Sequence, residues 1–345
     1  MNGDWMQELL RWFDCHRRDL PWREDSPRDP YRVWVSEIML QQTRTEAVRP
    51  YYTAWMEKFP TIRALAEAEE EDVLHQWQGL GYYSRARNLH KAAREIVSRC
   101  GGHMPEGRKE LLGLPGIGEY TAGAILSIAF GQREDAADGN VLRIYARLYR
   151  IHDDILKNTG KRKVIALVRK TISPERPGDF NEALMDLGAD ICIPRNPRCG
   201  TCPLLRYCGA CAAGETELLP VRTPKKEKQQ LYAACGICKR GNAFLMHLRP
   251  DTGMLASMWE FPMALAPGKK DCIALLEKLV GGAAGETLWT RHHVFTHRIW
   301  DMTAYRINGA RKPDGEDWQW ITPDEYRELP LAGPHARLAA AVEHL

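Results

Sequence analysis

The sequence has no long apolar run and little net charge. No apolar stretch reaches the roughly 20 residues that a membrane-spanning helix requires, and the N-terminus carries acids and helically spaced Trp and Leu side chains instead of a signal peptide. We therefore expect a cytoplasmic protein with no membrane partner. The formal net charge of +3 is weak evidence for a nucleic-acid partner, so a DNA-binding surface would depend on local basic clusters. The clusters at 161–163 and 225–228 are each, taken singly, more simply explained as a solvated face or a linker.

Strand patterns are nearly absent before Cys211. Amphipathic patterns there predict helices instead, and Asp29-Pro30 supplies an N-cap and a first-turn proline for one of them. The predicted helices span 5–18, about 30–43, 49–58, 61–68, 70–76, 84–100, 105–112, 119–130, 140–149, 161–171 and 179–190. This part is therefore expected to be all-α.

The chain changes character after Cys211. Residues 214–228 are polar, basic and proline-containing, which is typical of a linker. Beyond them, Arg240-Gly241-Asn242 separates two apolar runs as a β-hairpin turn does. Strands are expected at 231–239, 243–249, 291–306 and 318–321, and helices at 271–280 and 334–344. At 345 residues the chain has room for two or three domains, and we expect a helical part followed by a smaller α+β domain.

A glycine-rich corner between two predicted helices is a candidate DNA contact. Leu114-Pro115-Gly116-Ile117-Gly118 forces a sharp turn before a helix that begins at Glu119. Backbone N–H groups at such a turn and helix start can bind a phosphate without reading base sequence. An ordinary helical hairpin explains these five residues equally well.

Four cysteines near the end of the helical part are the candidate metal site. Cys192, Cys199, Cys202 and Cys208 are separated by six, two and five residues. Four thiolates at this spacing can surround one compact centre, and a Cys-four zinc site or two disulfides are the alternatives. The chain has ten cysteines in all. Those outside the pattern include Cys211, Cys235 and Cys238, which we interpret as structural or incidental.

Two carboxylates are candidate catalytic groups. Glu37 is the only charged residue in Val33–Thr43, and burial in such a segment would raise its pKa toward that of a general acid working near neutral pH. Asp138 precedes a predicted helix. A surface position for Glu37 and an N-cap role for Asp138 are the simpler explanations of either residue alone.

Together these stretches resemble a known family. LPGIG at 114–118, followed by Tyr120-Thr121-Ala122 and by Asp138 about twenty residues on, resembles the helix-hairpin-helix glycosylases of the endonuclease III superfamily, and the cysteine spacing resembles their four-iron four-sulfur loop. VSEIMLQQT at 35–43, GLGYYSRARNL at 79–89 and FNEALMDLG at 180–188 are similar to the adenine DNA glycosylase branch, the MutY family. Bifunctional members carry Lys where Tyr120 stands, so the resemblance implies an enzyme without lyase chemistry at that position.

The resemblance implies roles for individual residues. It implies Glu37 as the acid that protonates adenine and handles the attacking water, and Asp138, supported by Asn140 and Tyr120, as the carboxylate that stabilises the oxocarbenium sugar. Residues implied to bind the extruded adenine are Trp22, Arg23, Leu40, Glu182 and Met185, with Gln42 and Tyr82 as wedges in the duplex. Gly116 and Gly118 would contact phosphate, and Cys192, Cys199, Cys202 and Cys208 would hold one four-iron four-sulfur cluster, so we expect Cys199→Ser to lose most of the iron.

The resemblance also implies the domain organisation and the partner. The implied boundaries are 22–134 for a six-helix barrel, 1–21 with 135–212 for the iron-sulfur domain, 213–229 for a linker and 230–345 for a NUDIX-like domain. Residues 259–262 and 294–297 carry the weaker NUDIX-like resemblance, which implies that Thr296 and His297 contact 8-oxoguanine. No glutamate-rich metal box follows Gly253, so we expect no NUDIX hydrolase activity. The expected partner of this monomer is duplex DNA with A:8-oxoguanine or A:G mispairs; an endonuclease III-like lyase and a non-catalytic iron-sulfur DNA-binding protein are the rivals.

Overall fold

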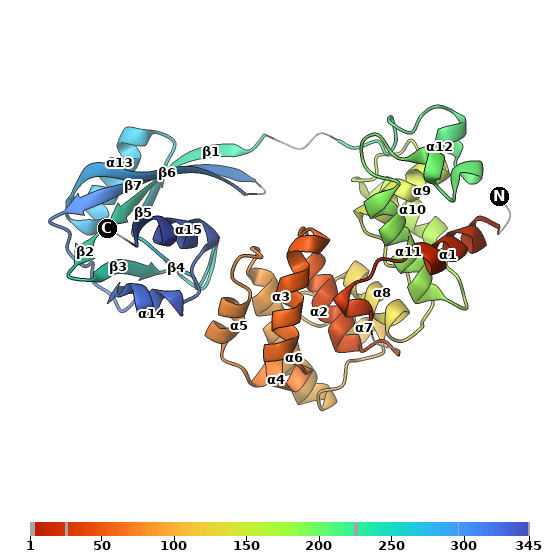
Figure 1. Cartoon of the computed structure of the whole chain (residues 1–345), viewed down its shortest axis with the longest axis horizontal. Coiled ribbons are helices and arrows are strands. Elements are labelled where there is room, and N and C mark those ends of the chain that lie inside the picture. The colour runs from red at the N-terminus through yellow and green to blue at the C-terminus, as the bar shows by residue number, and fades with distance from the viewer. Residues whose placement is uncertain (1–3, 25–26, 224–226, 296, 344–345) are drawn as a thin grey trace. The chain divides into compact units, whose positions relative to one another are not determined.

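A computed structural model of the chain describes residues 4–24, 27–223, 227–295 and 297–343 (Figure 1). The chain forms two compact units, Met1–Ala68 with Asn88–Pro224 and Glu69–Arg87 with Lys225–Leu345. One of the boundaries between them, at 87/88, falls inside helix α6 (Ser84–Cys100). The domain boundaries implied by sequence stay a prediction. No helix within the described ranges is long and apolar enough to cross a membrane.

The first unit is built from helices, and its described residues contain no strand. Its elements are α1 (Asp4–His16), η1 (Pro21–Arg23), α2 (Pro30–Leu40), α3 (Thr45–Lys58), α4 (Ile62–Glu67), most of α6, α7 (Arg108–Leu112), α8 (Glu119–Ile128), α9 (Gly139–Leu148), α10 (Asn158–Thr171), α11 (Pro177–Asp190), η2 (Cys199–Thr201), η3 (Leu205–Tyr207) and α12 (Gly209–Ala212). The predicted helical part is confirmed, and α2 begins as expected, because the side chain of Asp29 accepts a hydrogen bond from the Tyr31 amide at 2.8 Å.

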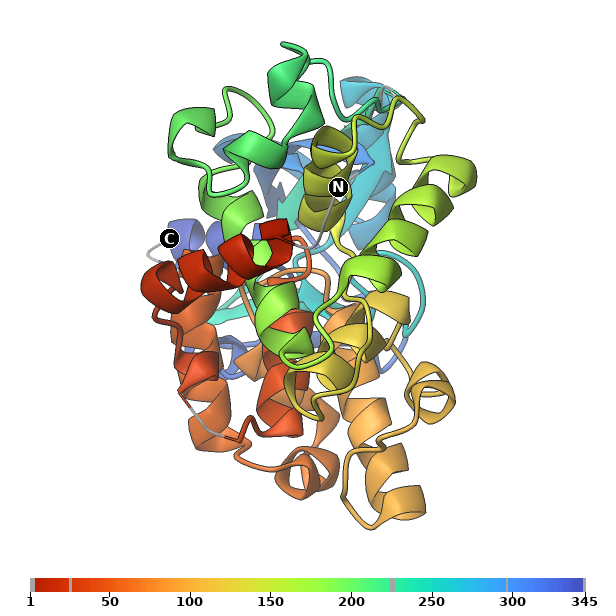
Figure 2. The same ribbon diagram turned by 90° about the vertical axis from the view of Figure 1, so that its right-hand side faces the viewer.

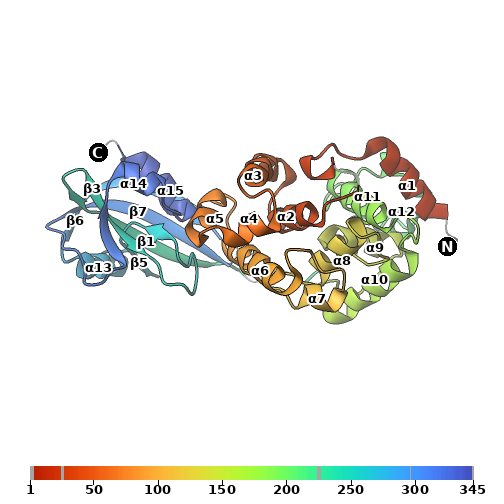
Figure 3. The same ribbon diagram turned by 90° about the horizontal axis from the view of Figure 1, so that it is seen from below.

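Helix α11 lies at the centre of the packing that supports the site. It contacts α1, α8 and α9, and α10 packs on α9 (Figure 3). From α1, the buried side chains Trp5, Leu9 and Phe13 recur every fourth residue and enter the core that α9, α10 and α11 share. The cysteine-containing loop after α11, with α12, lies at the opposite end of this unit from α4 (Figure 2).

The second unit is an α+β structure with two sheets. Its elements are α5 (Glu70–Gln76), β1 (Gln229–Ile237), β2 (Lys239–Arg240), β3 (Ala243–Leu248), β4 (Trp259–Glu260), β5 (Met263–Ala266), α13 (Lys269–Val280), β6 (Ala283–Val294), β7 (Arg298–Asn308), β8 (Trp318–Ile321), α14 (Pro323–Arg327) and α15 (Gly333–Val342). One sheet has the order β5-β1-β7-β6, with β1 parallel to β7, and in the other β3 pairs with β2, β4 and β8. The smaller α+β domain is thereby confirmed.

Alternation along β1 explains how this sheet is covered. Ala233, Cys235 and Ile237 enter a core with Leu338 of α15, whereas Ala234 enters a second core with residues of α13. Successive side chains of a strand point to opposite faces, so β1 is buried on both. The predicted strand at 291–306 is two strands, and β6 begins earlier than predicted, because the side chains of 283–290 are largely exposed and lack an apolar alternation.

Candidate active site and iron-sulfur site

One cleft in the first unit brings together most of the residues that the sequence singled out. It has a volume of about 840 Å³. The predicted residues that line it are Trp22, Arg23, Glu37, Leu40, Gln42, Gly116, Gly118, Tyr120, Asp138, Asn140, Glu182 and Met185. They span the sequence from Trp22 to Met185. The fold, and not closeness in sequence, brings them together.

Glu37 is a buried carboxyl group in this cleft. It lies on α2, whose side chains from Val33 to Met39 are all buried, and it is 6% exposed. Its Oε2 accepts a hydrogen bond of 2.6 Å from the hydroxyl of Tyr120. Burial raises the pKa of Glu37 to about 7; the Tyr120 hydrogen bond opposes the rise, and the neighbouring carboxylate of Glu182 adds to it. A carboxyl group with this pKa is partly protonated at neutral pH and can act as an acid.

Asp138 is both the N-cap of α9 and a wall of the same cleft. Its Oδ1 accepts 2.8 Å hydrogen bonds from the amides of Asn140 and Val141, and its Oδ2 accepts one of 2.9 Å from the Asn140 side chain. Burial raises the pKa of Asp138, and these hydrogen bonds act in the opposite direction. The capping role and the catalytic role are therefore compatible, because the cap orients a carboxylate that also faces the cleft.

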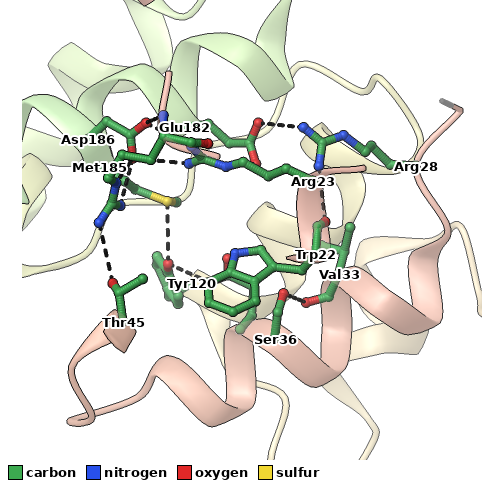
Figure 4. A network of polar contacts seen from close by, with 12 residues as sticks. Trp22, Arg23, Arg28, Val33, Ser36, Thr45, Tyr120, Glu182, Met185 and Asp186 are labelled. Carbon is green, nitrogen blue, oxygen red and sulfur yellow. Dashed lines mark hydrogen bonds and ion pairs between the residues drawn. The ribbon is translucent and has the colours of Figure 1, made fainter. Parts of the chain in front are cut away.

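A network of ion pairs forms the wall that carries the predicted adenine-binding residues (Figure 4). Arg23 Nε donates to Glu182 at 2.9 Å, and its Nη1 donates to Asp186 at 2.7 Å. Arg28 donates to the other oxygen of Glu182 at 3.1 Å. Across the network, Met185 lies with its sulfur 3.8 Å from the hydroxyl of Tyr120. Buried and paired on both sides, Arg23 is a fixed part of this wall.

The glycine corner between α7 and α8 lines the same cleft. Gly116 has a φ of +78°, and a Cβ built there would lie 2.7 Å from the Cβ of Asn88. Both constraints exclude a larger residue without movement of the backbone. Gly118 is the N-cap of α8, so the free amides of the first helical turn begin there.

The predicted cysteines surround a second, separate cavity. Cys192, Cys199, Cys202 and Cys208 all line it, and so does Cys211, which the sequence pattern left out. Within the described part of the chain, no three His, Cys, Asp or Glu side chains meet at one single-ion position. The sulfur atoms surround a space instead. A donor set of thiols around a cavity fits a multi-iron cluster better than one tetrahedral zinc ion.

A buried arginine holds the loop that carries these thiols. Arg147, 2% exposed, donates to the carbonyl oxygens of Ile193 at 2.7 Å, Pro194 at 3.1 Å and Leu219 at 2.9 Å. Its guanidinium also lies 3.4 Å from the sulfur of Cys192. Arg147 therefore fixes the backbone on both sides of the loop and lies against the sulfur of Cys192.

Comparison with known proteins identifies the family. Residues 35–173 match a model described as HhH-GPD superfamily base excision DNA repair protein, residues 192–208 match the iron-sulfur binding domain of endonuclease III, and residues 233–341 match a NUDIX domain. The adenine DNA glycosylase of Homo sapiens is 40% identical over an alignment that covers 92% of this chain and 70% of that protein. The chain belongs to the adenine DNA glycosylase family. The Schizosaccharomyces pombe relative is 35% identical, with 94% of this chain and 86% of the relative covered.

Solved structures agree with the helical fold of this glycosylase family. A thermostable thymine-DNA glycosylase has a TM-score of 0.55 and 29% identity, covering 61% of this chain and 96% of that chain. An endonuclease III–DNA complex, at 24% identity and a TM-score of 0.52, shares the fold. The predicted enzyme class, a DNA glycosylase of base excision repair, and its cofactor, a four-iron four-sulfur cluster, are confirmed.

Several residues of the glycosylase site were missed in the sequence. Further lining residues of the cleft are Arg18, Leu20, Gln41, Thr43, Thr45, Glu119, Thr121, Gly139, Lys161 and Ala189. Arg143, 3% exposed, donates to the side-chain oxygen of Asn140 at 2.9 Å and to the carbonyl oxygens of Gly188 and Cys192 at 2.7 Å. The available signal was the pair of arginines, Arg143 and Arg147, spaced four residues apart in the otherwise apolar run 141–148.

Three residues predicted for substrate binding belong to the second unit. Tyr82 is 44% exposed with a φ of +52°, an uncommon conformation for an aromatic residue. His297 is exposed in the turn between β6 and β7, where its carbonyl oxygen accepts from Gln229 at 3.1 Å. Thr296 lies outside the described residues. The roles of all three stay predictions.

Proposed function

We propose that the protein is a monofunctional adenine DNA glycosylase, active as a monomer, that hydrolyses the N-glycosidic bond of adenine mispaired with 8-oxoguanine or guanine. The observation that carries this proposal is the pair of carboxyl groups in one cleft, with the pKa of Glu37 raised to about 7 by burial. Two carboxyl groups in different environments can divide the work of glycosidic cleavage, one as an acid and one as a stabilising anion.

The environments of the two groups support a division of roles. Glu37, protonated and buried, donates its proton to the leaving adenine base and then, as a carboxylate, accepts one from the attacking water. Asp138, which accepts three N–H hydrogen bonds, faces the positive charge that develops on the sugar. Tyr120 keeps Glu37 oriented through its hydroxyl.

The binding of the target nucleotide follows from the wall of the cleft. An adenine extruded from the duplex enters between Trp22, Leu40 and Met185, with Arg23 and Glu182 presenting polar atoms to its edge. Gln42, at the rim with a φ of +58°, holds the opened base stack, and Tyr82 acts with it as the second wedge. The backbone at Gly116 and Gly118 contacts phosphate.

The remaining parts of the molecule contribute to binding. The thiols of Cys192, Cys199, Cys202 and Cys208 hold the cluster, which when bound cross-links four points of the loop and fixes its basic residues for contact with phosphate. Those basic residues are Arg195, Arg198 and Arg206. In the NUDIX-like domain, Thr296 and His297 contact the oxidised guanine opposite the adenine.

The test is an excision assay on three matched duplexes, containing A opposite 8-oxoguanine, A opposite G, or thymine glycol. Half of each reaction is treated with alkali, which cuts abasic sites, so base removal and strand cleavage are read separately. We expect alkali-dependent cleavage of both adenine duplexes, faster opposite 8-oxoguanine, and none of the third. Excision of thymine glycol would favour the endonuclease III-like rival, and binding without excision would favour the non-catalytic one.

The same reactions with borohydride test the monofunctional assignment. Tyr120 has no amine, so no imine with the sugar can form at that position. We expect no trapped protein–DNA adduct. Efficient trapping would show that another amine, such as Lys157 or Lys161, reaches the sugar, and would overturn this part of the proposal.

A further inference from the structure

The cavity that holds the predicted cluster ligands is lined by one more cysteine than a four-iron cluster needs. Cys211 lines it together with Cys192, Cys199, Cys202 and Cys208. Its side chain is half-buried like theirs. Four thiolates satisfy a four-iron four-sulfur cluster, so the fifth thiol requires an explanation of its own.

The local structure explains why Cys211 reaches the cavity. Cys208 is the N-cap of the one-turn helix α12, and Cys211 lies three residues further on. Residues three apart in a helical turn lie on the same side of it. The same separation links Cys199 and Cys202 across the short turn η2. The chain therefore presents two close cysteine pairs to one cavity, with Cys192 as the remaining thiol.

Side-chain contacts show which thiol Cys211 can replace. The side chain of Cys211 neighbours that of Cys199 and interacts with it electrostatically. The sulfur of Cys192 is held beside the Arg147 guanidinium at 3.4 Å, and the thiol of Cys208 donates to the Arg147 carbonyl oxygen at 3.7 Å. Cys192 and Cys208 are each held by Arg147, whereas the thiol of Cys199 has Cys211 as its neighbour. Cys211 is therefore placed to replace Cys199.

We propose that Cys211 is an alternative iron ligand that can take the position of Cys199 on the cluster. The proposal rests on the ligand set of the proposed function. In the exchange, one iron–sulfur bond to Cys199 breaks and one to Cys211 forms, while the Cys211 thiol gives up its proton and the released Cys199 thiolate gains one. No electron is transferred. Loss of Cys199 by substitution leaves the same position for Cys211, with the proton released to solvent.

The test compares four alanine variants purified without oxygen: Cys199→Ala, Cys202→Ala, Cys211→Ala and the double variant Cys199→Ala/Cys211→Ala. Alanine is used because a serine oxygen could itself bind iron. Iron per chain and the visible absorbance of the cluster are measured, with circular dichroism as the check on folding. We expect Cys211→Ala to keep its iron and Cys199→Ala to keep more than about half, whereas Cys202→Ala and the double variant lose most of it.

Thiol alkylation followed by mass spectrometry gives a second readout that does not depend on activity. In the wild-type protein, Cys211 should be alkylated while the four ligands are protected. In Cys199→Ala, Cys211 should become protected. Equal iron loss in Cys199→Ala and Cys202→Ala, or an alkylated Cys211 in an iron-containing Cys199→Ala, would overturn the proposal. Full iron in Cys202→Ala would instead overturn the ligand set itself, and the role of Cys211 with it.

Discussion

The cleft of the first unit and the β6–β7 turn of the second unit present their functional side chains in opposite ways. In the cleft, Glu37 and Glu182 are nearly inaccessible and each is hydrogen-bonded. At the turn, Val294 is 59% exposed and His297 is exposed. A group that transfers protons needs a fixed, desolvated position, whereas a group that reads a base must be reachable before the base arrives. Substitutions in the two regions should therefore fail differently.

The largest effect is expected from Glu37→Gln in the cleft. The amide fills the same space and accepts from Tyr120 but cannot give a proton to adenine, so the single-turnover excision rate should fall by about 10²–10⁴-fold while DNA binding is kept. Glu46→Gln, at a side chain that is 83% exposed, is the matched control and should match the wild type. A Glu37→Gln rate above about a tenth of the wild type would contradict the role of the acid.

The same substitution should change stability in the direction opposite to activity. Burial raises the pKa of Glu37 to about 7, whereas its pKa in the unfolded chain is about 4.3. The contribution of protonated Glu37 to folding stability is therefore complete below pH 4.3 and is lost as pH rises through about 7. Glu37→Gln, which does not ionise, should therefore be more stable than the wild type at pH 8, by up to about 4 kcal/mol at 1.36 kcal/mol per pKa unit.

Chemical denaturation of both proteins at pH 8 and at pH 4.5 measures this difference. The two unfolding curves should differ at pH 8 and nearly coincide at pH 4.5. If Glu37→Gln were less stable than the wild type at pH 8, the ionised form of Glu37 would not be destabilised by its burial. The contrast between the buried cleft and the exposed turn would then lose its basis.

Gly188→Ala should disturb the cleft without touching a reacting group. A Cβ at Gly188 would lie 2.5 Å from the Cβ of Asn140, which is too close to keep both in place. Displacement of Asn140 loosens Asp138, and we expect the excision rate to fall by about tenfold to a hundredfold. Gly333→Ala, where an added Cβ meets nothing within 4 Å, is the control. An unchanged rate with a folded protein would show that Asn140 need not be fixed.

The smallest effect is expected at the exposed turn, and in discrimination only. Thr296→Ala with His297→Ala should reduce the preference in affinity for 8-oxoguanine over guanine by about five- to a hundredfold, because a lost hydrogen bond to a base edge is worth roughly 1–3 kcal/mol. Dissociation constants for both duplexes at one salt concentration measure it. Equal losses for both duplexes would indicate that the two residues only hold the domain together.

The sequence predicted best what depends on local pattern. Glu37 was detectable because it is the only charged residue in the apolar segment Val33–Thr43. Asp29 and Asp138 were detectable because helix caps have short-range signatures. Asp186 was missed because its partner Arg23 lies 163 residues away along the chain. Arg143 was missed because two of its partners, Gly188 and Cys192, lie 45 and 49 residues away. The burial of Arg23 together with Glu182 and Asp186 cannot be predicted from residue spacing in the sequence. It arises only in the fold, where η1 and α11 come together.

Cys211 shows a different limit of sequence interpretation. Matching a spacing pattern assigns each cysteine either to the pattern or outside it, and Cys211 fell outside. The structure places it against the same cavity as the four ligands, because α12 turns back after Cys208. The expectation that loss of Cys199 empties the site treated the ligands as irreplaceable, and the presence of a fifth thiol changes that expectation.

Arg143 gives the two functional centres of the first unit a shared support. One guanidinium bonds both the partner of Asp138 and the backbone oxygen of Cys192. A displacement of the cysteine loop can therefore reach Asp138, the carboxylate that we propose faces the sugar, through the side chains of Arg143 and Asn140. Changes in the cysteine loop would then lower the catalytic rate in addition to weakening the proposed contact of its arginines with phosphate. The loss of rate could be mistaken for a defect in the cleft itself.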